Sequence, residues 1–131
     1  MQLLTEITEQ IEWIKLNKST QDIAALQEKT LELATNSFYL AALVAEWYEK
    51  SNNAEYSYKR AVESYMATST EAVSRAEYKA KSEYSDLNKE YRDTENTYKR
   101  LQLALAQCNV VIEQGRQAIS FLKQEKRHEV N

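Results

Sequence analysis

Residues 84–122 read YSDLNKE YRDTENT YKRLQLA LAQCNVV IEQGRQA ISFL when they are written in groups of seven. The first position of every group is aromatic or aliphatic, and the residues there are Tyr84, Tyr91, Tyr98, Leu105, Ile112 and Ile119. The fourth positions hold Leu87, Thr94, Leu101, Cys108, Gly115 and Leu122. Because these two positions share one stripe of an α-helix, the pattern predicts a long helix with a single packing seam, as in a coiled coil.

A second stripe of the same kind runs from Ile23 to Tyr65 and alternates steps of three and four residues without a slip. It includes Trp47 and predicts a second long helix. Its weak points are Asn36-Ser37 and Ser51-Asn52-Asn53, where a bend or a break is an alternative to one continuous helix. A shorter stripe near the start predicts a third, short helix, and its members are Leu4, Ile7, Ile11 and Ile14.

These stripes and the capping residues between them give the expected boundaries. We expect a single domain of 131 residues, with helices over about residues 2–16, 20–66 and 71–125 and a polar tail to residue 131 that frays into solvent. Ser19, followed by Asp22, resembles an N-cap for the second helix. Thr68 and Glu71 have the spacing of a capping box at the start of the third.

Folding the chain back near residue 69 brings the two long stripes face to face. Trp47 then lies opposite Tyr91, Leu40 opposite Tyr98, Ala54 opposite Tyr84 and Ile23 opposite Gly115. Large residues meet small ones at several of these pairs, as close packing requires. The predicted fold is therefore all-α, a long antiparallel, coiled-coil-like helical hairpin with a short N-terminal helix.

Further apolar residues lie outside the seams. Phe38, Ala41, Ala45 and Tyr48 form a second stripe on the second helix, and residues 101–112 are apolar on nearly every side. A helix that is apolar around most of its circumference is usually buried by more than one neighbour. We therefore predict a homo-oligomeric bundle, with a core or oligomer seam formed by Trp47, Tyr84, Tyr91, Tyr98, Leu105, Ile112 and Ile119. The alternative is a compact monomer of four or five helices, broken at Asn36 or Asn52.

The composition argues against a sheet protein and against most catalytic sites. The chain has one glycine and no proline, whereas tight β-turns depend on these residues. A single glycine cannot build a phosphate-binding loop, and a single histidine leaves few acid–base or metal arrangements. Cys108 is the only cysteine. We expect no enzymatic activity, no cofactor and no metal.

The charge of the chain bears on its partners. The net charge is −3, so no global positive field attracts nucleic acid or an anionic membrane. Basic residues concentrate after residue 70, and Lys99, Arg100 and Lys123 are candidate interaction residues there. The sequence lacks an uncharged apolar stretch of about 18 residues and a basic leader, so we expect no membrane partner and a cytoplasmic location.

Gly115 interrupts the helix formers of the third expected helix. Glycine inside a helix costs about 1 kcal/mol relative to alanine, so it calls for a kink or a close approach by another backbone or a ligand. Arg116 beside it could supply a charge at that approach. The competing interpretation is that Ile23 simply fills the space above Gly115.

Part of the chain resembles a known group. The segments KRAV at residues 59–62, VSRAEYKAK at 73–81 and QGRQAISFLK at 114–123 are similar to those of small helical proteins encoded by tailed bacteriophages. The resemblance covers about residues 59–123. It implies a gene near phage replication and recombination genes, action in the host bacterial cytoplasm, and no catalytic residues.

Together these features predict a phage-type interaction protein, an accessory or inhibitor that binds a host or phage protein. Proteins of DNA replication or recombination are the candidate targets. One alternative is direct binding of DNA or a nucleotide between protomers. Another is a structural role as a virion or scaffolding component.

Overall fold

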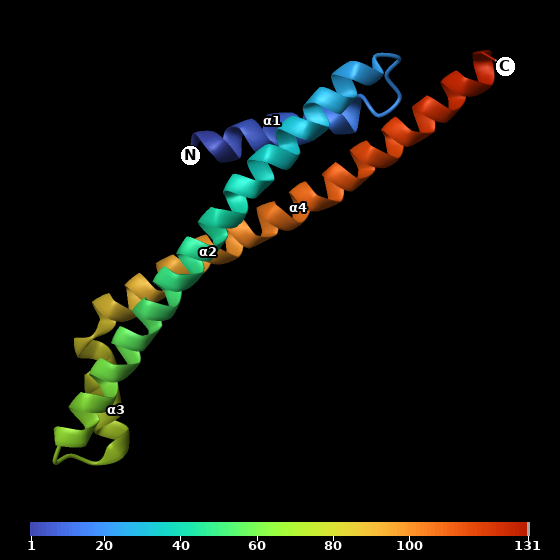
Figure 1. The fold of residues 1–131 in the computed structure, drawn as a ribbon. Helices are drawn as coiled ribbons and strands as arrows, with labels where there is room; N and C mark the ends of the chain where they lie inside the picture. Colours follow the sequence, from blue (N-terminus) through green and yellow to red (C-terminus); the bar gives the residue numbers. More distant parts are fainter. Residues whose placement is uncertain (131) are drawn as a thin grey trace. The chain divides into compact units, whose positions relative to one another are not determined.

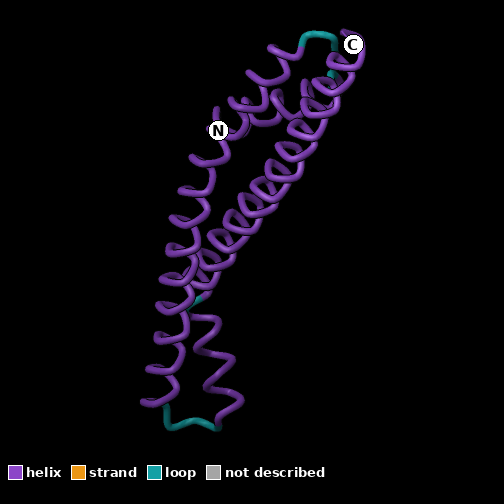
Figure 2. The backbone as a smooth tube through the Cα atoms, turned by 45° about the vertical axis from the view of Figure 1, so that its right-hand side comes forward, coloured by secondary structure: helices purple, strands orange, loops and turns teal. Residues whose placement is uncertain are grey.

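The computed structural model describes residues 1–130, and within them the regular secondary structure is entirely α-helical. Its four helices are α1 (Gln2–Leu16), α2 (Ile23–Thr68), α3 (Val73–Glu83) and α4 (Ser85–Val130) (Figure 1). Short connections join the helices (Figure 2). The connection between α1 and α2 is residues 17–22, that between α2 and α3 is residues 69–72, and Tyr84 alone joins α3 to α4. The prediction of an all-α protein is confirmed.

Helix α2 is continuous from Ile23 to Thr68, so the expected weak points do not break it. The Asn36 side-chain amide donates a hydrogen bond to Gln10 Oε1 of α1 at 3.1 Å. The Ser37 hydroxyl donates to the Ala34 carbonyl oxygen at 2.7 Å. Because these polar groups are satisfied without opening the helix, they do not act as breakers here.

The start of α2 differs from the expected one. Asp22, and not Ser19, is the capping residue: its Oδ1 accepts the backbone N–H of Ala25 at 3.0 Å. The Asp22 backbone N–H in turn donates a hydrogen bond to Thr20 Oγ1 at 3.2 Å. Asp is as good an N-cap as Ser, and residue spacing alone did not distinguish the two.

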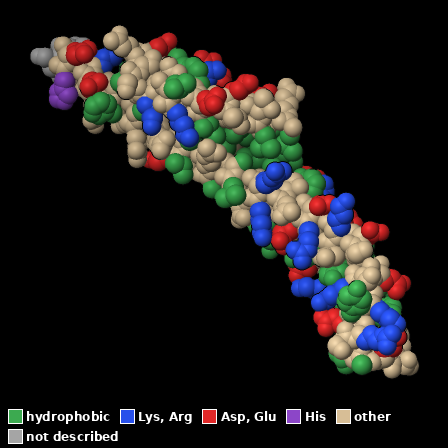
Figure 3. Space-filling view, turned by 180° about the vertical axis from the view of Figure 1, so that it is seen from behind, with side chains coloured by type: hydrophobic (Ala, Val, Ile, Leu, Met, Phe, Trp, Pro, Cys, Tyr) green, Lys and Arg blue, Asp and Glu red, His purple; other side chains and the backbone are tan. Residues whose placement is uncertain are grey.

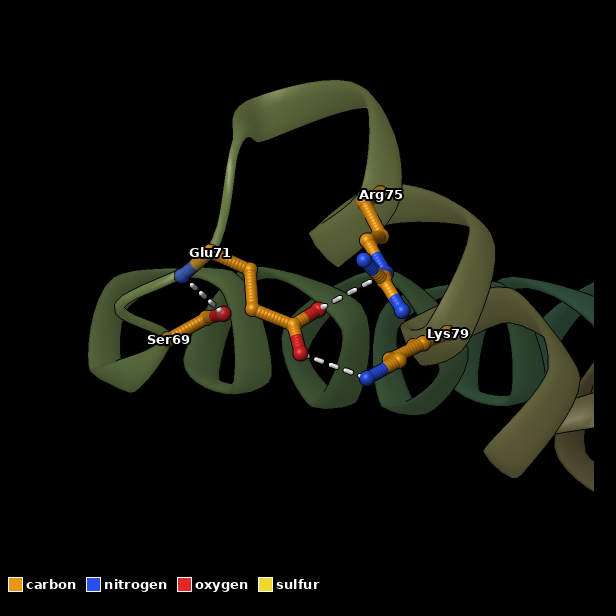
Figure 4. Close-up of polar contacts among 4 residues, drawn as sticks. All are labelled: Ser69, Glu71, Arg75 and Lys79. Carbon is orange, nitrogen blue, oxygen red and sulfur yellow. Dashed lines mark hydrogen bonds and ion pairs between the residues drawn. The ribbon is translucent and has the colours of Figure 1, made fainter.

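The predicted capping box at residues 68–71 is also wrong. Thr68 ends α2, where its hydroxyl lies 3.2 Å from the Tyr65 carbonyl oxygen. The Glu71 carboxylate does not reach back to a backbone N–H but pairs with Lys79 and with Arg75 (Figure 4). Its hydrogen bond with Lys79 holds the pKa of Glu71 below the usual range. These ion pairs tie the α2–α3 connection to the body of α3.

The single helix expected over residues 71–125 is two helices. Tyr84 separates α3 from α4 with φ −101° and ψ 27°, outside the α-helical range. The residues after it, Ser85 and Asp86, are of the types that favour helix starts, a signal that the continuous heptad pattern concealed. At the other end α4 continues to Val130 instead of fraying after residue 125. Its last turn holds Arg127 and His128, and positive charge there stabilises a helix C-terminus.

The described chain divides into two compact units. Unit 1 comprises residues 1–42 together with the chain from Gln102 onward, and so contains α1, the first part of α2 and the last part of α4. Its core is aliphatic. The buried apolar residues of unit 1 are Ile7, Ile11, Ile14, Leu26, Leu33, Leu40, Cys108, Val111 and Ile112.

Unit 2 comprises residues 43–101, with the rest of α2, all of α3 and the start of α4. Its fully buried side chains are few and mostly small: Ser51, Ala76, Ala80 and Leu101. Aromatic rings fill the remaining contacts at half burial. The rings of Tyr48 and Tyr98 have centroids 5.2 Å apart, and those of Tyr65 and Tyr84 meet edge to face at 6.4 Å.

These contacts shift the predicted pairing by seven to eleven residues along α2. Thr30, seven residues after Ile23, is the residue that lies against Gly115. Tyr98 meets Tyr48 and not Leu40, and Tyr84 meets Tyr65 and not Ala54. Since heptad stripes look alike after a shift of seven residues, the pattern predicted that the stripes face each other but not the register.

The N-cap of α2 is testable with a matched pair of variants. We expect Asp22→Ala to lower the free energy of unfolding by about 1 kcal/mol, because the N–H of Ala25 loses its acceptor. Ser19→Ala should change it by less than about 0.5 kcal/mol. Urea denaturation followed by circular dichroism measures both. Equal effects of the two substitutions would contradict the assignment of Asp22 as the cap.

Candidate functional site

Gly115 lies where α2 and α4 approach closely within unit 1. Gly115 is buried, and a Cβ atom added to it would lie 2.6 Å from Thr30 Oγ1 and 3.1 Å from Thr30 Cγ2. The Thr30 side chain is itself buried, and its hydroxyl donates to the Leu26 carbonyl oxygen at 2.7 Å. Gly115 is therefore explained by close packing against a side chain of the same chain.

The basic candidate residues do not converge on one site. Arg116 and Lys123 are exposed on the part of α4 in unit 1, whereas Lys99 and Arg100 are exposed in unit 2. Lys99 forms an ion pair with Glu95 at 3.2 Å. The same i,i+4 pairing recurs at Lys59 with Glu55 and elsewhere on α2 and α3. Much of the basic charge is thus neutralised locally.

Tyr91 stands in a polar cluster of unit 2. Its hydroxyl donates to Glu95 Oε2 at 2.7 Å, and the Glu55 carboxylate lies close to the same hydroxyl. The hydrogen bond to Glu95 is the main cause that raises the pKa of Tyr91 to about 12. The same bond, with help from Lys99, holds the pKa of Glu95 below its usual range. The cluster therefore orients the phenol of Tyr91.

The predicted seam residues line the interiors of the two units. Ile112 is buried, and Trp47, Tyr84, Tyr91, Tyr98, Leu105 and Ile119 are half-buried. Cys108 is also buried, and the burial raises the pKa of its thiol, so the thiolate needed for reactivity is disfavoured. The seam thus serves packing within the chain.

The largest unexplained feature is apolar surface on the outside of unit 1. On α2, Leu31, Ala34, Phe38 and Ala41 follow one another at helical spacing, and we call these four residues the α2 apolar face. Phe38 is 76% exposed and Leu31 68% exposed, Ala41 is exposed and Ala34 is half-buried.

A second apolar stripe lies on α4. Leu103, Ala106 and Val110 form the α4 apolar face; Leu103 is 72% and Val110 56% exposed, and Ala106 is exposed. Figure 3 shows on one side of the molecule how hydrophobic side chains gather over one stretch, while charges of both signs alternate over another. Side chains this large, exposed in contiguous stripes, usually mark interaction surfaces.

Sequence reasoning found part of these surfaces. It identified Phe38 and Ala41 as an apolar stripe and residues 101–112 as apolar all round, but it continued the first stripe to Ala45 and Tyr48. It missed Leu31 and Ala34, which extend the stripe at the same spacing in the other direction. The signal was available, since Leu31 stands seven residues before Phe38.

One open hollow lies along α2 and is lined by Asn52, Glu55, Tyr56, Lys59, Arg60, Glu63 and Ser64. A shallow groove between α1 and α2 is lined by Glu6, Gln10, Leu31, Glu32, Thr35 and Asn36. Among residues 1–130, no group of three or more His, Cys, Asp or Glu side chains is placed to hold a metal ion. In the same part of the chain, no helix has the length and apolarity needed to cross a bilayer. Comparisons with models of protein families, with curated proteins and with solved structures give no match.

The contact between Gly115 and Thr30 predicts a coupled pair of substitutions. Gly115→Ala gains helix propensity worth about 1 kcal/mol, but it forces Cβ into Thr30, and overpacking costs about 1 to 3 kcal/mol. The two terms together give a net loss of up to about 2 kcal/mol in the free energy of unfolding. With Thr30→Ala present, the same substitution should be neutral or stabilising by up to about 1 kcal/mol.

Chemical denaturation of the four proteins of this double-mutant cycle measures the coupling. Gly115→Leu serves as the severe control, because no movement of Thr30 alone makes room for it. If Gly115→Ala has the same effect with and without Thr30, the two residues are not in contact in solution.

The polar cluster around Tyr91 predicts a late-titrating tyrosine. In an alkaline titration followed by tyrosinate absorbance, one tyrosine should ionise near pH 12. Tyr91→Phe should remove this component. Glu95→Gln should move it to lower pH, because the carboxylate that stabilises the neutral phenol is gone. A late component that survives Tyr91→Phe would show that it belongs to another tyrosine.

Proposed function

We infer that this chain is a non-enzymatic helical interaction protein that self-associates and binds protein partners through exposed apolar faces of its helices. In this proposal α2 and α4 form an antiparallel, coiled-coil-like hairpin that displays those faces. The role is that of an accessory or inhibitor of a host or phage protein in the bacterial cytoplasm. The resemblance of residues 59–123 to small tailed-phage proteins supports this setting.

The observation that carries the proposal is the apolar surface of unit 1. Leu31, Phe38, Leu103 and Val110 are all more than half exposed, although unit 1 already buries an aliphatic core of its own. Exposing contiguous apolar side chains to water is unfavourable by roughly 25 cal/mol per Å² relative to burying them. Covering the stripes with another helix recovers this free energy.

Direct binding of DNA or a nucleotide is less well supported by the charges. The net charge is −3, and Lys50, Lys59, Lys81 and Lys99 each pair with a glutamate one turn earlier. A phosphate backbone would have to compete with these carboxylates. The structure supplies no specific observation in favour of a virion or scaffolding role.

Light scattering on the purified chain tests the proposal. One chain has a mass of 15.3 kDa, and we expect a larger mass that rises with protein concentration and persists at high salt, because apolar association is not screened. A mass of 15.3 kDa across the accessible range would overturn self-association. Retention on a polyanion column that collapses with salt would instead favour nucleic-acid binding.

A further inference from the structure

Most of the α2 apolar face lies away from α1, and only its edge at Leu31 lines the groove between α1 and α2. Helix α1 contacts α2 through Asn36, which donates to Gln10, and through Lys29, whose ammonium lies 6.0 Å from the centroid of the Trp13 ring. Residues two positions apart on a helix point in nearly opposite directions, so Asn36 and Phe38 lie on opposite sides of α2. The α2 apolar face is therefore open to a further helix.

Large and small side chains alternate along the α2 apolar face, so the face can pack against the same face of a second copy. The steps from Leu31 to Ala34, Phe38 and Ala41 are three, four and three residues, and they read the same in both directions. When a second copy runs antiparallel, Leu31 of each copy comes opposite Ala41 of the other, and Phe38 opposite Ala34. Each large side chain then meets a small one. In a parallel pair, Phe38 would meet Phe38 and Ala41 would meet Ala41, which packs poorly.

Charge also permits this pairing. No charged residue belongs to the α2 apolar face. The flanking positions on one side are Glu28, Thr35 and Ala42, and those on the other side include the uncharged Thr30 and Ser37. In the antiparallel register, Thr35 comes beside Thr35 of the second copy and Glu28 beside Ala42. The pairing thus brings no two like charges together, although the chain as a whole is acidic.

We propose that the α2 apolar face is an antiparallel homodimer interface. In it Leu31 packs against Ala41 of a second copy and Phe38 packs against Ala34. The two helices cross at the level of residue 36 along the axis of α2. The proposal rests on the self-association inferred above and names the surface that performs it. An interface of about three helical turns is small for a specific protein complex, so we expect a weak dimer whose population rises with protein concentration.

The α4 apolar face provides a contrast within the same unit. Leu103, Ala106 and Val110 are spaced by three and four residues, so the reversed order does not match the forward one. If this face paired with itself in an antiparallel orientation, Leu103 would lie opposite Val110, and the two copies of Ala106 would lie together. Large side chains would then meet large ones, and small side chains would meet small ones. This face suits a different partner, and it supplies control positions for the dimer.

Thiol cross-linking of the full chain tests the register directly. Thr35→Cys and Glu28→Cys both place a cysteine at an exposed position of α2, and the native Cys108 is buried. In the antiparallel dimer the two copies of residue 35 are adjacent, whereas the two copies of residue 28 are about 24 Å apart along the helices, at 1.5 Å per residue. A short bifunctional thiol reagent should therefore cross-link Thr35→Cys into dimers and leave Glu28→Cys monomeric.

A size swap tests the packing of individual layers. Leu31→Ala and Ala41→Leu should each weaken dimerisation by at least about tenfold, through a cavity and a clash respectively. The double variant Leu31→Ala with Ala41→Leu restores one large and one small residue in each layer, so it should dimerise nearly as well as the native chain. Leu103→Ala, a change at a similarly exposed leucine on α4, should have no effect.

The results of these experiments distinguish failure of the α2 interface from failure of self-association as such. Equal cross-linking of Thr35→Cys and Glu28→Cys, or failure of the double variant to recover, would overturn the antiparallel α2 pairing. If the mass still exceeds 15.3 kDa in either case, self-association stands and uses another surface. A monomer at every concentration overturns both.

Discussion

The close approach of α2 to α4 at Thr30 and Gly115 is the constraint on which the packing of unit 1 depends. Thr30 Oγ1 lies so near the Gly115 backbone that no larger residue fits without movement. This contact fixes which turn of α2 faces which turn of α4. The neighbouring layers then follow, since Leu26, Leu33, Cys108 and Ile112 are all buried. A single small residue therefore selects one register among several that the heptad pattern allows.

The sequence predicted the class of the fold and the faces of its helices because apolar periodicity is a local property. It could not predict the register, because stripes that repeat every seven residues match equally well after a shift of seven. The break at Tyr84 was missed for a similar reason: the heptad positions continue through it. Gly115 was recognised as unusual, but its partner was Thr30 and not Ile23, one heptad earlier. The exposure of the α2 and α4 apolar faces depended on where α1 packs, which sequence spacing does not contain.

The two units solve the packing problem with different side chains. Unit 1 buries isoleucine, leucine and valine and holds the glycine contact, whereas unit 2 has alanines on α3 and half-buried tyrosine rings. Tyrosine covers apolar area while its hydroxyl reaches water or a carboxylate, as Tyr91 does with Glu95 at 2.7 Å. Unit 2 can therefore be stabilised with little fully buried volume. Its surface carries ion pairs beside exposed side chains such as Tyr56, Val73 and Tyr78.

The difference between the units bears on where binding occurs. A protein that used its charges for recognition would keep basic groups unpaired and gathered on one face, whereas many of the lysines here pair with glutamates one turn away. Unit 1 exposes Leu31, Phe38, Leu103 and Val110 although it also buries an aliphatic core, whereas three of the large apolar side chains that unit 2 exposes are tyrosines, Tyr48, Tyr56 and Tyr78. Because the α2 apolar face is complementary to itself and the α4 apolar face is not, the two faces suit different occupants. Pairing through α2 would leave α4 free to bind a second protein, so self-association and partner binding need not compete.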